Sequence, residues 1–444
     1  MIFLERKEWE MAEYEDRERF IPFQKAEIVE MIKKDGTLKE KEQELFADFC
    51  KILQSLYHFE FHDKVESLKE NYYPFNPDKD TITLRKYPEE KLKECEKNLV
   101  SQFQEVLNDA NYEEVTEEDI RLALEEESLF KISLYVDFDD FDSYLLFWRG
   151  DKTDKVTIKK FFFFKKEILV PTFERIAMLI KFKDAEYFKK KKRKNIKFEP
   201  GSMVIKLFKN IPKADLEMLF PNTQVQMKLK DKLMMGGAAL GGGIGVLLKA
   251  SAGLIALVTV IWYLVTSFLT NGGIPELGKA QIAQMVGGLT ALGVIGGFVW
   301  KQWTNYKNRT IRFMKALADN LYFKNLDNNV GVFHHIIDAA EEEEFKEAML
   351  GYYFLLKSEK PLTEAELDDR IEEWFEKKYN VLIDFEVDDS LRKLKELKLC
   401  KEVGSNEKGE PLYEALTLQE GCERLDYIWD NYFSYNNNLD GGEN

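Results

Sequence analysis

The residues most suited to chemistry are two histidines four positions apart, His58 and His62. On a helix both side chains would lie on one face, an arrangement that suits a zinc ion. Glu60 and Asp63 are close in sequence, but Glu60 would face away and no third ligand is evident. We therefore expect partly buried histidines near a helix end, and no metal site.

The other reactive residue types follow no recognised catalytic spacing. The sequence has no P-loop, no G-x-S-x-G and no H-E-x-x-H, and its GGGIG segment does not complete a dinucleotide-binding fingerprint. The four cysteines, Cys50, Cys95, Cys400 and Cys422, share no C-x-x-C spacing, which argues against a disulfide framework and a zinc site. We expect no cofactor, and no motif supports an enzymatic activity.

The densest run of charge is KKKKRK, formed by Lys189, Lys190, Lys191, Lys192, Arg193 and Lys194. Such a run suits a solvated loop, nucleic acid, anionic lipid headgroups or acidic segments of the same chain. Base stacking would require interleaved aromatic residues, and the run has none. We therefore favour anionic headgroups or the acidic flanks as its partners, and expect no nucleic-acid binding.

Charge is unevenly distributed along the 444 residues, whose formal net charge is -16. Residues 1–150 hold 21 basic and 38 acidic residues, and residues 310–444 hold 16 and 31. Residues 151–232 reverse this balance, with 22 basic and 10 acidic residues. The basic part of the chain therefore lies next to the most apolar segment.

That apolar segment holds two charge-free stretches of 21 residues, at 250–270 and 280–300. As helices each would be about 31 Å long, close to the thickness of a bilayer's hydrocarbon core. The segment NGGIPELGK between them is typical of a tight turn. We expect a transmembrane helical hairpin, with Trp262, Tyr263, Trp300 and Trp303 as interface anchors.

Basic residues near the ends of the hairpin predict its orientation. Lys228, Lys230 and Lys232 precede it, and Lys301, Lys307, Arg309 and Arg312 follow it. Both soluble flanks are therefore expected on the cytoplasmic side, or on the equivalent face of an organelle membrane. The first 20 residues resemble neither a secretion signal nor a transit peptide, so insertion is expected to rely on the internal apolar segment.

Small residues recur along both apolar stretches. They include Gly237, Gly241, Gly245 and Gly253 before and within the first stretch, and Gly287, Gly293 and Gly297 within the second. Bare backbone on one helix face permits close helix contact, either within the hairpin or between copies of the chain. Residues 234–248 are compatible with a re-entrant piece, an interfacial piece or an extension of the first helix.

The flanks are expected to fold as an α+β protein. Residues 1–128 predict an acidic helical domain, with helices near 26–32, 40–69 and 89–107 and a further helix capped at Thr116–Asp119. Residues 129–232 predict a basic β-rich domain, with antiparallel strands at 142–151, 155–164, 176–182 and 203–208. Turns are expected at Arg149-Gly150-Asp151 and at Glu199-Pro200-Gly201. Residues 233–309 form the glycine-rich hairpin.

Residues 310–444 predict a winged-helix-like domain with a disordered tail. Helices are expected at 341–356 and 363–378, and a third capped by Asp388 or Asp389. A β-hairpin at 399–403 and 411–415 and a last helix from Thr417 follow. Winged helices often bind DNA, but this flank is too acidic to bind phosphates. A contact with a partner protein is the expected role.

Several longer motifs resemble a known family. They are RERFIPF (17–23), YYPFNPD (72–78), LLFWRG (145–150), IKLFKNIPKADLEMLFPN (205–222), the glycine-rich hairpin and RLDYIWDNYF (424–433). Together they resemble the transmembrane protein 143-like family, which is named for a domain of unknown function. The resemblance implies a membrane topology, and for a sequence without a recognisable targeting extension it implies a bacterial inner membrane. It supplies no activity or catalytic residues.

These observations favour a membrane-anchored, cytoplasm-facing scaffold or adaptor that forms homo-oligomers. One alternative is an oligomeric pore built from the transmembrane hairpins. Another is a membrane-tethered enzyme with an unrecognised site. The expected partners are a bilayer with anionic headgroups, further copies of the chain and a protein bound through the C-terminal domain.

Overall fold

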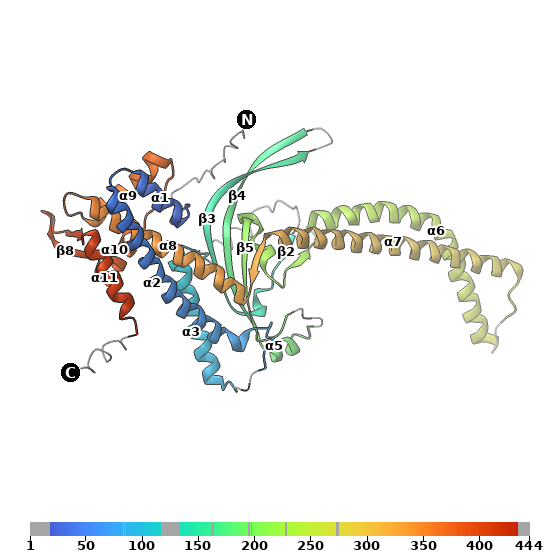
Figure 1. Cartoon of the computed structure of the whole chain (residues 1–444). Coiled ribbons are helices and arrows are strands. Elements are labelled where there is room, and N and C mark those ends of the chain that lie inside the picture. The colour runs from blue at the N-terminus through green and yellow to red at the C-terminus, as the bar shows by residue number, and fades with distance from the viewer. Residues whose placement is uncertain are drawn as a thin grey trace, which may run out of the picture. The chain divides into compact units, whose positions relative to one another are not determined.

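A computed structural model describes residues 18–82, 84, 86–116, 133–160, 164–193, 196, 198–226, 229–271 and 275–433 (Figure 1). The fold is mixed α/β, with antiparallel sheets and a majority of helix. The helix expected from a cap at Thr116–Asp119 lies outside these residues, as does the C-terminal tail.

The helices are α1 (Lys25–Lys34), α2 (Glu40–Tyr72), η1 (Tyr73–Phe75), α3 (Glu89–Asp109), η2 (Phe138–Asp140), α5 (Ala185–Lys190), η3 (Lys213–Leu219), α6 (Leu229–Asn271), α7 (Lys279–Lys324), α8 (Val330–Lys357), α9 (Glu364–Tyr379), α10 (Val387–Glu396) and α11 (Leu418–Asp430). The strands are β1 (Glu113–Glu114), β2 (Ser133–Tyr135), β3 (Phe141–Lys160), β4 (Phe164–Phe182), β5 (Met203–Pro212), β6 (Gln224–Gln226), β7 (Asn325–Asn328), β8 (Cys400–Ser405) and β9 (Pro411–Ala415).

The chain divides into two compact units. The first, called the soluble unit below, comprises residues 1–125, 138–216 and 324–444. The second, called the hairpin unit, comprises residues 126–137 and 217–323 and contains α6 and most of α7. The soluble unit is therefore assembled from stretches of chain on both sides of the hairpin.

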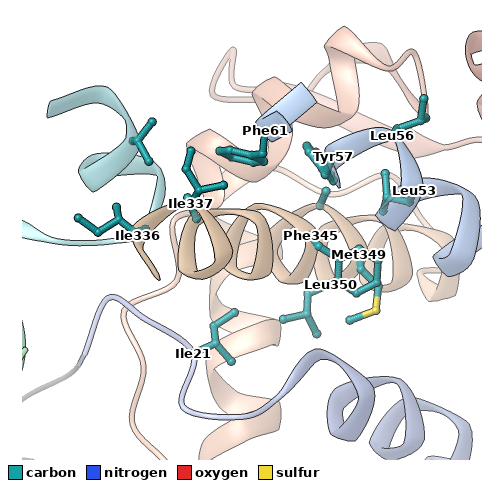
Figure 2. Close-up of a cluster of buried hydrophobic side chains, with 14 of the residues drawn as sticks. Ile21, Leu53, Leu56, Tyr57, Phe61, Ile336, Ile337, Phe345, Met349 and Leu350 are labelled. Carbon is teal, nitrogen blue, oxygen red and sulfur yellow. The ribbon is translucent and has the colours of Figure 1, made fainter. Parts of the chain in front are cut away.

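Helix α8 lies at the centre of the soluble unit's core (Figure 2). Phe345, Met349 and Leu350 on α8 pack among buried side chains of α2, and Ile21 reaches the same core from the N-terminal segment. This core also includes residues of α3, β5, α9 and α10. These segments therefore share one continuous hydrophobic core, and burial of its apolar area is the main term that stabilises their packing.

A five-stranded antiparallel sheet, in the order β1-β3-β4-β5-β7, completes the soluble unit. Its longest pair is the β3–β4 hairpin, in register from Ser143 opposite Lys181 to Lys160 opposite Phe164. The expected alternation of β5 is visible in its burial, since Met203, Ile205 and Leu207 are buried on the core side. Short strands β2 and β6 pair within the hairpin unit.

The expected turn at Arg149-Gly150-Asp151 is wrong, because β3 runs through it as one strand. Gly150 has a φ of 75°, which a glycine adopts without strain, so the chain is irregular there while the pairing with β4 continues on both sides. The turn at Glu199-Pro200-Gly201 is present, and Gly201 has a φ of 82°.

The C-terminal elements follow the predicted order of helices, β-hairpin and final helix. Thr363 and Glu366 form the expected capping box of α9, and Thr417 and Glu420 form that of α11. The predicted cap of α10 is wrong, because the N-cap residue is Glu386. Asp388 and Asp389 lie in the first turn, where their negative charges interact favourably with the helix dipole.

Residues 234–248 belong to α6, which is continuous from Leu229 to Asn271. Of the three alternatives for this stretch, the extension of the first apolar helix is the one observed. At 43 and 46 residues, α6 and α7 are each about twice as long as a bilayer requires.

Candidate functional site

Two helical stretches stand out because they are apolar and uncovered. Ala250–Thr270 of α6 has a mean hydropathy of 2.1, and Lys279–Asn305 of α7 one of 1.7. Only 6% of the first window and 11% of the second is buried within the chain. A buried helix of a soluble core would be covered by protein, so these two faces require lipid or another protein as their environment.

The two helices approach closely where Gly253 of α6 meets Gly287, Gly288 and Ala291 of α7. A Cβ atom added to Gly253 would lie 2.8 Å from the carbonyl oxygen of Gly287 and 3.0 Å from the Cβ of Ala291. Ala250, Val260 and Ala291 are buried near this crossing. Only glycine therefore permits the observed backbone approach at residue 253.

Four glycines of α7 have room for a side chain among the residues that the structure describes. A Cβ atom added to Gly287, Gly293, Gly296 or Gly297 would meet none of their atoms within 4 Å. The environment of Gly237, Gly241 and Gly245 on α6 lies outside the described side chains. The structure thus brings together Gly253 and Gly287 of the predicted set, and no described atom lies within 4 Å of a Cβ atom added to Gly293 or Gly297.

Immediately after α7 the chain re-enters the soluble unit. Strand β7 pairs with β5, with Lys206 opposite Asn328 and Leu207 opposite Asp327. Asn329, at the N-cap of α8, donates its backbone N–H to the carbonyl of Ile205 (2.7 Å), and its side-chain oxygen accepts from Ile205 N–H (3.1 Å). The buried Tyr72 hydroxyl donates to the same side-chain oxygen at 2.8 Å.

Sequence reasoning missed Asn329. It has a φ of 52°, which asparagine tolerates better than most residues, and its amide also donates to Asp78. Tyr72 and Asp78 are the ends of the YYPFNPD motif. That motif therefore fixes the chain where it returns from α7.

The basic run Lys189–Lys194 is partly used within the protein. Arg193 forms an ion pair with the fully buried Asp140, and Lys191 lies 3.5 Å from Asp139 and over the Tyr187 ring. Lys189 and Lys190 form the last turn of α5, and Lys192 follows with a φ of 50°. Lys194 lies outside the described residues.

A cluster of buried charge lies inside the soluble unit, between α8 and α10. The ammonium of Lys393 contacts carboxylate oxygens of Glu347 and of Glu344 (2.9 Å) and lies 3.7 Å from Asp389. The Asn111 amide donates to Glu347 at 2.9 Å, and the side chains of Lys393 and Glu347 are each only 2% exposed. In the sequence this cluster is visible only as the run EEEEFKE within an otherwise apolar helix. Whether that run is buried or exposed depends on the fold.

Burial dominates the protonation behaviour of this cluster. Desolvation raises the pKa of Glu344 and that of Glu347 to about 7, although Lys393 opposes the shift. For Lys393 burial alone would lower the pKa, but the Glu347 and Glu344 carboxylates outweigh it and raise the pKa. One ammonium thus serves two carboxylates, which hold a proton more tightly than exposed glutamates do.

The expectation for the histidines is wrong in its placement. His58 and His62 lie in the middle of α2, and both are exposed. His58 Nδ1 is 2.8 Å from Glu341, a carboxylate at the edge of the buried cluster. Leu56, Tyr57 and Phe61 form part of the buried face of α2, and the two histidines lie beside this face.

Residues 173–331 match the model of a protein family of unknown function, DUF3754. The matched stretch runs from β4 through β5, both apolar helices and β7 to the start of α8. No solved structure matches the chain.

Proposed function

We propose that this protein is a membrane-anchored scaffold whose α6–α7 hairpin crosses a bilayer and whose soluble unit lies entirely on one side. The pairing of β7 with β5 carries this proposal, because it joins the chain just after the hairpin to the chain just before it. A chain that leaves and re-enters one folded body must cross the membrane an even number of times.

The properties of α6 and α7 support the anchoring step. The apolar window of α6 is 21 residues long, or about 31 Å as a helix, which matches the hydrocarbon core. Its large side chains, including Ile255, Trp262 and Leu269, are exposed in the single chain, as is Trp300 on α7. Lipid tails would cover this surface, and the tryptophans would lie at the headgroup level.

The proposed orientation places the soluble unit in the cytoplasm of a bacterium, with residues 275–278 on the opposite side of the inner membrane. The lysines and arginines flanking the hairpin support this orientation, because cytoplasmic segments near membrane spans are enriched in basic residues. We also propose membership of the transmembrane protein 143-like family on the motifs quoted above. Residues 173–331 match a family of unknown function, so neither comparison assigns an activity.

Self-association through the hairpin is the second part of the proposal. The close approach where the two helices cross requires Gly253 and Gly288, whereas a Cβ atom added to Gly293, Gly296 or Gly297 would meet none of the described atoms within 4 Å. In lipid, small residues allow helices of neighbouring chains to approach and pack. The C-terminal elements α8, α9, α10, β8 and β9, in winged-helix order, would then present a protein-binding surface.

The test is the copy number of the full-length protein in lipid nanodiscs, measured by native mass spectrometry. We expect assemblies in the parent, a smaller copy number in a Gly293→Leu/Gly297→Leu variant, and no change in a Val299→Leu control. A parent that is monomeric at every protein-to-lipid ratio would overturn self-association. Extraction of the parent from membranes by alkaline carbonate would overturn the anchor, and ion flux through proteoliposomes would replace the scaffold with a pore.

A further inference from the structure

An open groove of about 340 Å³ lies between the end of α8, one face of α9 and the segment after α1. Its floor is aromatic, formed by Tyr353, Phe354 and Trp374, whose last two rings contact edge to face with centroids 5.7 Å apart. A volume of this size suits a small organic molecule. The groove lies within the soluble unit, so its geometry is independent of the hairpin.

The rim of the groove is basic although the surrounding sequence is acidic. Lys357, Arg370, Lys377 and Lys378 line it, against only two acidic residues, Asp35 and Glu373. Residues 310–444 as a whole hold 16 basic and 31 acidic residues. A local excess of positive charge in such a segment favours an anionic ligand.

The existing ion pairs do not use all of this positive charge. Lys378 pairs with Asp35 and Lys377 with Glu373, which satisfies both acids of the groove. Lys357 donates to the carbonyl of Thr37 at 2.7 Å and approaches Glu42 only to 4.0 Å.

Arg370 is the most available cation of the rim. Its guanidinium donates to the hydroxyl of Ser358 at 3.1 Å, and no carboxylate lies within ion-pair distance in the part of the chain that the structure describes. By contrast, the exposed Arg392 on α10 contacts both Asp389 and Glu396. A planar guanidinium with free donors is suited to bidentate binding of a phosphate group.

We propose that this groove binds a phosphate-bearing small molecule with an apolar body. Arg370 and Lys357 hold the phosphate, and the parts of the Phe354 and Trp374 rings that line the groove contact the body. A soluble aromatic phosphate monoester and a phospholipid share this chemistry, and the experiment distinguishes these two sources. The inference stands apart from the membrane anchor and from self-association.

The probe is 1-naphthyl phosphate, titrated by calorimetry into the full-length protein in a neutral detergent. We expect it to bind at least ten times more tightly than inorganic phosphate or 1-naphthol, because each supplies only half of the proposed contacts. The Arg370→Gln variant should lose about tenfold in affinity, equivalent to roughly 1.4 kcal/mol. The matched control Arg392→Gln should bind as the parent does, and circular dichroism should show that both variants are folded.

Three outcomes would overturn the proposal. Equal binding of 1-naphthol and 1-naphthyl phosphate would make the groove a purely apolar site. Loss of affinity in Arg392→Gln to the same extent as in Arg370→Gln would indicate diffuse electrostatic attraction. Absence of binding by the folded parent would exclude the site, whereas competition of 1-naphthyl phosphate by short-chain phosphatidic acid would support it and assign a lipid source.

Discussion

Removal of the buried ammonium of Lys393 is the sharpest test of how the soluble unit is held together. In a Lys393→Met variant a side chain of similar length fills the same space, but Glu344 and Glu347 lose the cation that both contact. Breaking a buried ion pair in this way costs about 3–5 kcal/mol, because an uncompensated charge remains in the interior. We expect a loss of this size near pH 8, measured by denaturant unfolding of the full-length protein in detergent.

The pH dependence of this loss identifies its cause. Without Lys393 the pKa values of Glu344 and Glu347, already raised to about 7, should rise further. Near pH 5 both carboxyls would then be protonated and neutral, so the variant should recover most of the loss. The control Lys401→Met, at an exposed position on β8, should be neutral at both pH values. Full stability of Lys393→Met near pH 8, or a larger loss near pH 5, would refute the reasoning.

Three further predictions concern other parts of the chain. In the parent, Glu347 has a folded-state pKa above its ordinary value, so its contribution to the free energy of unfolding should fall by about 3 kcal/mol as pH rises from about 4.5 through 7. In the same unfolding assay Glu347→Gln should remove this part of the slope and leave the part due to Glu344, and an unchanged slope would contradict the assignment. Gly253→Leu should reduce the yield of folded protein in membranes, because its side chain would meet the Gly287 backbone, whereas Gly296→Leu should not; equal yields would contradict the crossing. Lys189→Gln/Lys190→Gln should weaken binding of the soluble unit to anionic vesicles by up to about 1 kcal/mol per charge without loss of stability. Arg193→Gln should instead destabilise the fold by leaving Asp140 buried without its ion pair. The prediction is contradicted if the Lys189→Gln/Lys190→Gln variant is destabilised and Arg193→Gln only weakens vesicle binding.

Local signals in the sequence predicted much of the fold. The three-and-four spacing of apolar residues located α2, and the capping boxes at Thr363 and Thr417 located the starts of α9 and α11. These signals depend on neighbouring residues alone. The start of α8 at Val330, eleven residues before the predicted start, was missed because its first turns contain glycine, histidine and β-branched residues of lower helix propensity.

The parts that escaped prediction depend on contacts between distant segments. The single core that joins α2, α8 and α10 cannot be read from periodicity, because each helix shows only that one of its faces is buried. The burial of Lys393 and of the α8 glutamates cannot be predicted from local sequence, because only the fold brings them together in the interior. The groove at Arg370 likewise needs α8, α9 and the segment after α1 together.

The central claim is that the hairpin crosses a membrane and returns to the same side. Cysteine substitutions at the exposed positions Asp80, Glu276 and Lys408 sample the first flank, the turn and the second flank. The four native cysteines are buried, so they should contribute little labelling. With a membrane-impermeant maleimide on intact bacterial cells, we expect labelling only of the Glu276→Cys variant, and labelling of all three after permeabilisation. Different labelling of the Asp80→Cys and Lys408→Cys variants, or labelling of all three in intact cells, would contradict the account.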